Sequence, residues 1–322
     1  MVELLVILDG ASEPWDGARP TSLERARTPA LDALARDGEL SRVRTVPDRL
    51  PAGSETAIPV LLGWVSGEPV DRARIEAAAH RIAVGDDEGA WRVDVRAADR
   101  ARADAEATRR AARELAAAAP DHAVHRLVGH RLLLVGPAPV PAAAHAPHLT
   151  LWPEGAALPS TLGPETVVVA ARGAASGIAT LLGATVVSPA GATGDAYTDL
   201  HAKAAAAIAA LDDGATRIVV HAGGADEAAH TRDAAAKVAF LERADHELIA
   251  PLHAAAARAG AVLSVCPDHG CDAATGAHDD RPVPHVRWDG ATPRGARPPR
   301  RLTERDVASL SVTDLTTAPV PA

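Results

Sequence analysis

Aromatic side chains are scarce in this sequence: five Trp, one Tyr and one Phe make up 2% of 322 residues. Lysine is equally scarce, since only Lys203 and Lys237 occur among 33 basic residues. Hydrophobic residues still make up 47% and charged residues 23%, close to globular averages, which excludes general disorder. We therefore expect a core of Ala, Val, Leu and Ile with few aromatic anchors.

Cysteines and long apolar runs are also lacking. Cys266 and Cys271 are too few for a disulfide framework, so a reducing cytoplasm is the expected location. No apolar run reaches about 18 residues, the length needed to span a membrane. Residues 3–10 lack the basic region and cleavage site of a signal peptide. We expect a cytoplasmic protein without a membrane partner.

The charge balance is acidic, with 42 Asp and Glu against 33 Lys and Arg and a net charge of −9. No basic stripe interrupts it. This balance argues against nucleic acid and anionic membrane surfaces as main partners.

Short apolar runs alternate with helical patterns over most of the chain. A helix is predicted at 28–38, with Thr28 as N-cap, Pro29 at the first helical position and Gly38 as its end. Further strands are predicted at 4–8, 166–170, 217–221 and 261–265, and further helices at 174–182, 199–211 and 233–258. Strands that alternate with helices predict an α/β fold with a mostly parallel sheet.

The pattern of predicted strands and helices changes from about residue 67. A strand is predicted at 91–96, a long helix at 101–119, a hairpin from 122–128 and 131–135, and a linker at 137–147. We therefore expect a smaller inserted α+β domain at 67–159. The core domain would then comprise 1–66 and 160–322.

Potential metal ligands follow three of the predicted strands. Asp9 ends the first, the strand at 217–221 leads to Asp226 and His230, and Asp268 with His269 ends the last; His278 follows in a loop. Ligands gather at the carboxyl ends of strands in α/β sheets, and Asp226 and His230 share a helical face at i, i+4 spacing. Singly, each residue is more simply explained as a turn, cap or packing residue. Together they offer oxygen and nitrogen ligands for two divalent ions.

Ser54 begins a predicted helix at 54–62. Its hydroxyl could act as a nucleophile if a metal ion lowered its pKa, or it could simply cap the helix. Cys266 and Cys271 flank Asp268 and His269, and a thiolate ligand is the less favoured interpretation of either. His221 and His285 are interpreted as second-shell or packing residues.

Several segments together resemble one family. They occur in the same order as in the archaeal-type, cofactor-independent phosphoglycerate mutases of the alkaline phosphatase superfamily. The resemblance covers most of the chain and is weakest from about Gly67 to Pro159. The matching segments are Val6–Gly10, Pro51–Ala57, Gly191–Gly194, Ala225–His230, Pro267–His269 with His278, and Pro282–Pro284.

This resemblance implies an alkaline-phosphatase-like, mostly parallel sheet sandwiched by helices. It also implies two divalent ions, usually Mn²⁺, with Zn²⁺, Mg²⁺ or Co²⁺ as variants. In the family the serine takes the phosphoryl group from one hydroxyl of phosphoglycerate and returns it to the neighbouring one, which makes Ser54 the catalytic nucleophile. The implied ligands are Asp9, Ser54, Asp268 and His269 for one ion, and Asp226, His230 and His278 for the other.

The resemblance further implies that the inserted domain binds the phosphate and carboxylate of a small phosphorylated substrate. Arg72, Arg92 and Arg131 are the candidates there, because arginine forks suit both groups. The catalytic lysine that the family places just before the strand at Val167 is absent, since Glu165 and Thr166 stand there. Arg172 or Lys203 could replace it, although a solvent-facing helix residue is the simpler interpretation of Lys203.

The inserted domain also lacks an Asp-Thr-Asp-Pro run of the family, and residues 144–148 stand in its place. Three functions therefore stay open. The first is a mutase that interconverts 3- and 2-phosphoglycerate. The second is a phosphatase or phosphotransferase for another small phosphate ester, and the third is a non-catalytic remnant. The protein is expected to be a monomer or a small homo-oligomer.

Overall fold

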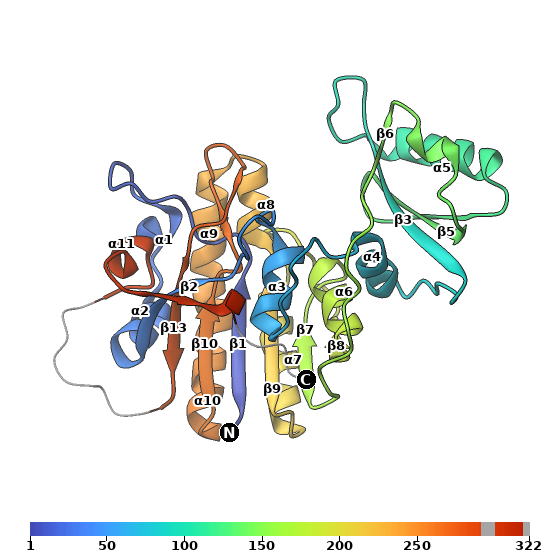
Figure 1. Cartoon of the computed structure of the whole chain (residues 1–322). Helices are drawn as coiled ribbons and strands as arrows, with labels where there is room; N and C mark the ends of the chain where they lie inside the picture. Colours follow the sequence, from blue (N-terminus) through green and yellow to red (C-terminus); the bar gives the residue numbers. More distant parts are fainter. Residues whose placement is uncertain (291–299, 318–322) are drawn as a thin grey trace. The chain divides into compact units, whose positions relative to one another are not determined.

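The chain divides into two compact units in the computed structural model, which describes residues 1–290 and 300–317 (Figure 1). Unit 1 comprises Met1–Gly67 and Ser160–Ala322, and unit 2 comprises Glu68–Pro159. The two units are described separately below.

An eight-stranded sheet forms the centre of unit 1, in the order β14-β2-β13-β10-β1-β9-β7-β8. β1 lies between β10 and β9 and is parallel to both, and β7 continues the parallel array to β8. Only β13 runs antiparallel to its neighbours β10 and β2. The prediction of an α/β fold with a mostly parallel sheet is confirmed. The strands are β1 (Glu3–Leu8), β2 (Glu39–Arg44), β7 (Thr166–Val169), β8 (Thr185–Val187), β9 (Arg217–Ala222), β10 (Val262–Cys266), β13 (Val283–Trp288) and β14 (Val312–Asp314).

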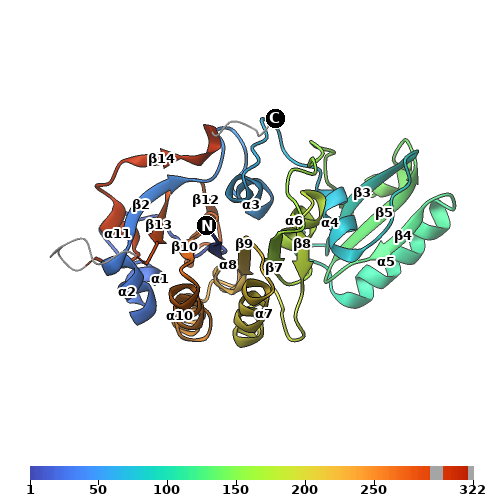
Figure 2. The same ribbon diagram turned by 90° about the horizontal axis from the view of Figure 1, so that it is seen from below.

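Helices cover both faces of this sheet. Figure 2 shows α2, α10 and α7 in a row along one face and α3 with α6 on the other. In the described part of the chain, no helix is both long and apolar enough to cross a membrane. The helices of unit 1 are α1 (Ser22–Arg25), α2 (Pro29–Asp37), α3 (Ser54–Leu62), α6 (Ala174–Leu181), α7 (Leu200–Asp212), α8 (Gly224–His230), α9 (Ala234–Ala244), α10 (Ala250–Ala259) and α11 (Glu304–Val307), with a π-helical turn at Asp245–Ile249 and a 3-10 turn at Leu315–Thr317.

α2 confirms the predicted helix but not the predicted capping contact. It runs from Pro29 to Asp37, between Thr28 and Gly38, yet the Thr28 side chain makes no capping hydrogen bond. The carboxylate of Asp245 accepts hydrogen bonds from the backbone N–H groups of Ala30 and Leu31 instead. A residue more than 200 positions away thus satisfies the free donors of the first turn.

The core of unit 1 is aliphatic, as the composition predicts. It is built mainly from Ala, Val, Leu and Ile of the central strands and of the helices that cover them. Phe240 is 1% exposed within it. Gly224 leaves room for the Phe240 ring, because a Cβ at position 224 would lie 2.4 Å from a ring carbon.

A four-stranded sheet in the order β4-β5-β3-β6 forms unit 2, with antiparallel pairing throughout. The predicted hairpin is confirmed by the pairing of β4 with β5. The predicted linker at 137–147 is wrong, because it includes the end of β5 and a 3-10 turn whose Ala144 is fully buried. The elements are α4 (Arg72–His80), β3 (Glu88–Val95), α5 (Ala105–Ala118), β4 (Ala123–Arg126), β5 (Arg131–Pro137), the 3-10 turn Ala142–His145 and β6 (Leu149–Leu151).

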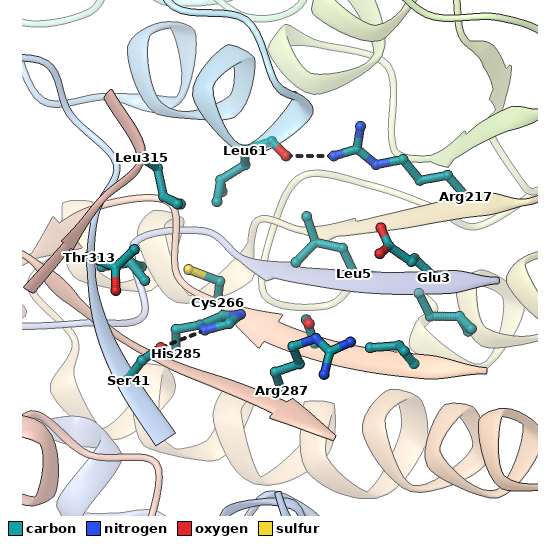
Figure 3. A pocket seen from close by; sticks show the side chains of 14 residues that line it. Glu3, Leu5, Ser41, Leu61, Arg217, Cys266, His285, Arg287, Thr313 and Leu315 are labelled. Carbon is teal, nitrogen blue, oxygen red and sulfur yellow. Dashed lines mark hydrogen bonds between the residues drawn. The ribbon is translucent and has the colours of Figure 1, made fainter. Parts of the chain in front are cut away.

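A pocket of about 260 Å³ lies in unit 1 and is lined by residues of β1, β2, β10, β13 and the end of α3 (Figure 3). His285 points into it beside Cys266, and its Nδ1 lies 2.8 Å from the Ser41 hydroxyl. This contact supports the interpretation of His285 as a packing residue. Burial, reinforced by the nearby Arg287, lowers the pKa of His285 from its ordinary 6.5 to about 4.

This depressed pKa predicts a pH-dependent stability. Between pH 6.5 and 4 the unfolded chain protonates His285 while the folded chain does not, so stability falls as the pH falls. His285→Asn should remove a loss that reaches about 3 kcal/mol by pH 4. Urea unfolding of both proteins at pH 7.5, 5.5 and 4.5 measures this. A difference in unfolding free energy between the two proteins that stays constant with pH would contradict the assignment.

Candidate metal centre

The predicted ligands of unit 1 meet where its central parallel strands end. Asp9 follows β1, and Asp268 with His269 follows β10. His221, which is not among the predicted ligands, lies near the end of β9 beside them. These three strands are adjacent and parallel, so their carboxyl ends lie at one edge of the sheet. Ligand atoms of Asp9, His221 and Asp268 lie within 4.8 Å of one another, and so do those of Asp9, Asp226 and His269. We call these five residues, Asp9, His221, Asp226, Asp268 and His269, the strand-end group.

Asp9 lies at the centre of the strand-end group. Its carboxylate lies 3.1 Å from His221 Nε2 and 3.3 Å from His269 Nε2. Asp268 Oδ1 accepts hydrogen bonds from the backbone N–H groups of Gly10 and His269, and Oδ2 lies 3.6 Å from His269 Nε2. Gly10, at φ +60°, lets Asp226 lie close to the end of β1, since a Cβ at position 10 would lie 2.7 Å from the Asp226 side chain.

A second group of donors is built by a helix and a two-stranded ribbon. Asp226 and His230 are one turn apart on α8, as predicted, with His230 Nε2 3.1 Å from Asp226 Oδ2. The ribbon pairs β11 (Gly270–Cys271) with β12 (His278–Asp279) and places Cys271 opposite His278. Ligand atoms of Asp226, His230, Cys271 and His278 lie within 4.8 Å of one another. We call these four residues the ribbon group.

Hydrogen bonds to the backbone fix the protonation of three histidines. Nδ1 of His230, His269 and His278 lies 2.8 to 3.1 Å from the carbonyl oxygens of Gly276, Gly270 and Ala52 respectively. A carbonyl only accepts, so each Nδ1 carries a proton and Nε2 is the ring nitrogen left to bind a cation. The Nε2 atoms of His230 and His278 lie 3.0 Å apart. Two ring nitrogens at this distance beside the Asp226 carboxylate fit a bound cation.

The electrostatics of the strand-end group are consistent with a bound cation. Burial and the neighbouring Asp9 raise the pKa of Asp268 to about 6. Burial opposes protonation of His269, but Asp268, Asp9 and Asp226 outweigh it and raise its pKa to about 10. Burial and Asp226 raise the pKa of Asp9, but hydrogen bonds from His221 and His269 bring it down to about 2. Positive charge is therefore strongly favoured among these buried carboxylates.

Ser54 is the first residue of α3, and its hydroxyl points at the strand-end group. Ser54 Oγ donates to the Asp9 carboxylate, with distances of 3.2 and 3.3 Å to its two oxygens. The simpler interpretation as an N-cap is wrong, because Gly53 occupies the cap position and its carbonyl accepts the first hydrogen bonds of α3. The Ser54 hydroxyl is therefore not used for capping and contacts Asp9 of the strand-end group instead.

Both lysines are fully buried, so the simpler interpretation of Lys203 as a solvent-facing residue is wrong. Lys203 Nζ donates to the carbonyl oxygens of His221 and Thr193 at 2.9 and 3.4 Å. Lys237 Nζ donates to the Cys271 carbonyl at 2.6 Å and pairs with Glu13 at 3.1 Å. Burial lowers the pKa of Lys203 to about 8, although Asp9 opposes this. Arg172 is exposed between β7 and α6.

The three predicted arginines of unit 2 converge on the buried carboxylate of Glu76. Arg92 Nη1 lies 3.2 Å from it, and Arg72 and Arg131 each approach it to 3.8 Å. Arg92 also donates to Asp94 and stacks on the Trp152 ring at 4.3 Å. Arg92 is 4% exposed, whereas the Arg131 side chain is 28% exposed.

A family model described as "Metalloenzyme superfamily" matches residues 1–317. The chain belongs to the metalloenzyme superfamily. Its donor groups therefore lie in a fold whose family is defined by metal-dependent enzymes, and candidate ligands for divalent ions are present in it.

Curated relatives of this metalloenzyme are named as phosphoglycerate mutases, which confirms the predicted resemblance. A probable 2,3-bisphosphoglycerate-independent phosphoglycerate mutase of Geobacter sulfurreducens is 25% identical over 92% of both chains. The 2,3-bisphosphoglycerate-independent phosphoglycerate mutase of Methanopyrus kandleri is 37% identical over 121 residues, 38% of this chain and 28% of the relative.

Solved structures share the fold of this metalloenzyme. A protein of Pyrococcus horikoshii has a TM-score of 0.78 at 22% identity and covers 98% of this chain and 94% of its own. A cofactor-independent phosphoglycerate mutase of Thermoplasma acidophilum has a TM-score of 0.62 at 19% identity, covering 99% and 98%. These matches confirm the predicted fold class.

Two side chains lie closer to the predicted ligands than the sequence indicates, those of His221 and Cys271. His221 is predicted to support the site or to pack, yet its Nε2 lies 3.1 Å from the Asp9 carboxylate. A signal was present for His221, because it stands at the end of a predicted parallel strand next to that of Asp9. For Cys271 the signal was its spacing from His278, which allows a short hairpin with both side chains on one face.

Proposed function

We propose that this chain is a metal-dependent phosphoglycerate mutase that interconverts 3- and 2-phosphoglycerate through phosphorylated Ser54. The observation that carries the proposal is the Ser54 hydroxyl, which lies at the start of α3 and donates to Asp9 among the metal-donor groups. The names of the curated relatives support the same substrate.

Two divalent ions fit the two donor groups. We propose that Asp9, Ser54, Asp268 and His269 hold one ion and that Asp226, His230 and His278 hold the other. Such ions supply positive charge that favours ionisation of a serine hydroxyl and neutralises phosphoryl oxygens. Mn²⁺ is the metal proposed for the strand-end group, whose oxygens and imidazole suit it, with Mg²⁺, Zn²⁺ or Co²⁺ as alternatives.

The residues of the chain have defined parts in the proposed reaction. Asp9 accepts the Ser54 hydrogen bond and orients Oγ toward the phosphoryl group of the substrate. The Oγ–P bond forms while the P–O bond to one substrate hydroxyl breaks, and that hydroxyl takes up the proton lost by Ser54. The start of α3 stabilises the phosphorylated serine, because helix N-termini favour anions. The neighbouring substrate hydroxyl then attacks the phosphoserine, and Ser54 regains a proton.

Arginines of unit 2 are proposed to bind the phosphate and carboxylate of the substrate. Two substitutions separate this role from a structural one. Arg131→Gln should raise the KM by about tenfold and leave the melting temperature unchanged, because its guanidinium is partly exposed. Arg92→Gln should lower the unfolding free energy by about 3 kcal/mol, because it removes the nearest cationic partner of two buried carboxylates, Glu76 and Asp94. Equal KM values for Arg131→Gln and the parent protein would contradict the binding role.

A coupled assay tests the proposed function. Purified protein loaded with Mn²⁺ and Zn²⁺ is given 3-phosphoglycerate without bisphosphoglycerate, and 2-phosphoglycerate is followed through its dehydration to phosphoenolpyruvate. Release of inorganic phosphate is measured in parallel. Isomer formation without phosphate release supports a mutase. Phosphate release without isomer formation identifies a phosphatase, an outcome consistent with the missing family lysine at positions 165 and 166. No activity in the metal-loaded protein would overturn the proposal.

A further inference from the structure

Cys271 is a fully buried thiol at the edge of the ribbon group. It is 0% exposed, and the antiparallel ladder pairs it directly with His278. Directly opposed side chains in such a ladder lie on the same face of the ribbon. The Cys271 Sγ is therefore presented toward the same space as the His278 Nε2, and both lie within 4.8 Å of the Asp226 and His230 donors.

The backbone around Cys271 is held from both sides. Its N–H donates to the Ser12 carbonyl at 2.9 Å, and its own carbonyl accepts from Lys237 Nζ at 2.6 Å. Lys237 is itself fully buried and paired with Glu13. These bonds fix the position of Cys271 before any ligand arrives, which is how a preorganised donor is built.

A second observation points to a ligand in the same space. Asp226 is 9% exposed, and its buried Oδ1 lies 3.3 Å from His278 Nε2 but completes no hydrogen bond of good geometry in the described structure. The Nδ1 atoms of His230 and His278 contact backbone carbonyls, so their Nε2 atoms are the nitrogens that face this space. The four residues therefore offer one sulfur, two nitrogens and one carboxylate oxygen around a common point.

We propose that Cys271 is a thiolate ligand of the ion in the ribbon group, which makes this a Cys-His-His-Asp site selective for Zn²⁺ over Mn²⁺ and Mg²⁺. The inference rests on the proposed function only in that the ribbon group binds a divalent ion. Soft thiolate ligands favour zinc, and four ligands of these types suit its tetrahedral coordination. The strand-end group contains no cysteine, so the two groups differ in the metal they select.

Cys266 provides a matched control within the same chain. It is also fully buried, but its Sγ contacts the Pro267 carbonyl, and its side chain lines the pocket in Figure 3 beside His285. A thiol in that place is not offered to the ribbon group. Cys266→Ser and Cys271→Ser thus differ in position but not in chemistry.

Cobalt substitution tests the proposal without relying on activity. Metal-stripped protein is titrated with Co²⁺, and the near-ultraviolet absorption is followed, because a cobalt–thiolate bond gives an intense charge-transfer band there. The parent protein and Cys266→Ser should both show the band, whereas Cys271→Ser should bind Co²⁺ without it. Mutation of a residue that only hydrogen-bonds to a metal ligand lowers metal affinity about 10- to 100-fold. Cys271→Ser replaces the proposed ligand itself, so its zinc affinity should fall by at least about 10-fold.

Each outcome decides between the alternatives. Cobalt bound to the parent protein without the band would overturn the thiolate ligand while leaving the two-ion proposal intact. A band that persists in Cys271→Ser would also overturn it. Failure of the parent protein to bind Co²⁺ or Zn²⁺ at all would overturn the metal site itself. If Cys271→Ser does not fold, the spectrum of Cys266→Ser settles the question, because Cys271 is the one cysteine left in that variant.

Discussion

Ser54→Ala should lower the rate of phosphoglycerate isomerisation by at least about 10³-fold, because the proposed reaction has no other acceptor for the phosphoryl group. The effect should lie in kcat, since the substituted protein keeps the arginines proposed to bind substrate. Phosphate transfer to the protein should disappear as well. Rapid acid quenching with labelled substrate, followed by intact-mass measurement, detects the phosphorylated parent protein and its absence in Ser54→Ala.

A matched serine substitution separates catalysis from folding. Ser41→Ala removes a hydroxyl that lines the pocket in Figure 3, and it should leave the isomerisation rate within about twofold of the parent value. Ser54→Ala should still bind an ion at the ribbon group, whose donors it does not alter. If Ser54→Ala kept more than a tenth of the parent activity, phosphorylation of Ser54 would not be part of the reaction.

The predictable part of the site came from local patterns. Asp9, Asp268 and His269 end apolar runs, and parallel strands bring their carboxyl ends to one edge, so these residues were expected to meet. The i, i+4 spacing of Asp226 and His230 placed both on one helical face in the same way. Such inferences need only the period of a helix or the direction of a strand.

The remaining part depends on long-range packing that the sequence does not display. Lys203 looked like a surface residue of a helix, and only the packing of α7 against β9 shows that its ammonium is enclosed beside the His221 carbonyl. The cap of α2 comes from Asp245, more than 200 residues away. Cys271 lies beside the other candidate ligands because the ribbon pairs it with His278, a contact that depends on the fold of the loop between them.

Removal of divalent ions should destabilise the protein more than any single substitution discussed above. The donor groups hold three carboxylates, of Asp9, Asp226 and Asp268, close together and mostly buried. An ion that binds only the folded chain adds about 4.1 kcal/mol of stability at 1,000 times its dissociation constant. Two independent ions would therefore add about 8 kcal/mol. Urea unfolding after chelation, and again after Mn²⁺ and Zn²⁺ are restored, measures this difference.

The dependence of this stabilisation on pH and on His230 shows whether it comes from ions bound by the histidines. Metal binding needs unprotonated Nε2 atoms on the histidines, so the stabilisation should shrink as the pH falls and protons compete with the ions. His230→Ala should lose the stabilisation by the ion of the ribbon group and keep that by the ion of the strand-end group. His253→Ala, which alters a histidine of α10 outside both groups, should keep the stabilisation by both ions. Identical unfolding curves with and without ions would mean that the carboxylates are balanced by His221 and His269 alone. In that case the raised pKa of His269 would reflect a buried ion pair rather than a space built for a cation.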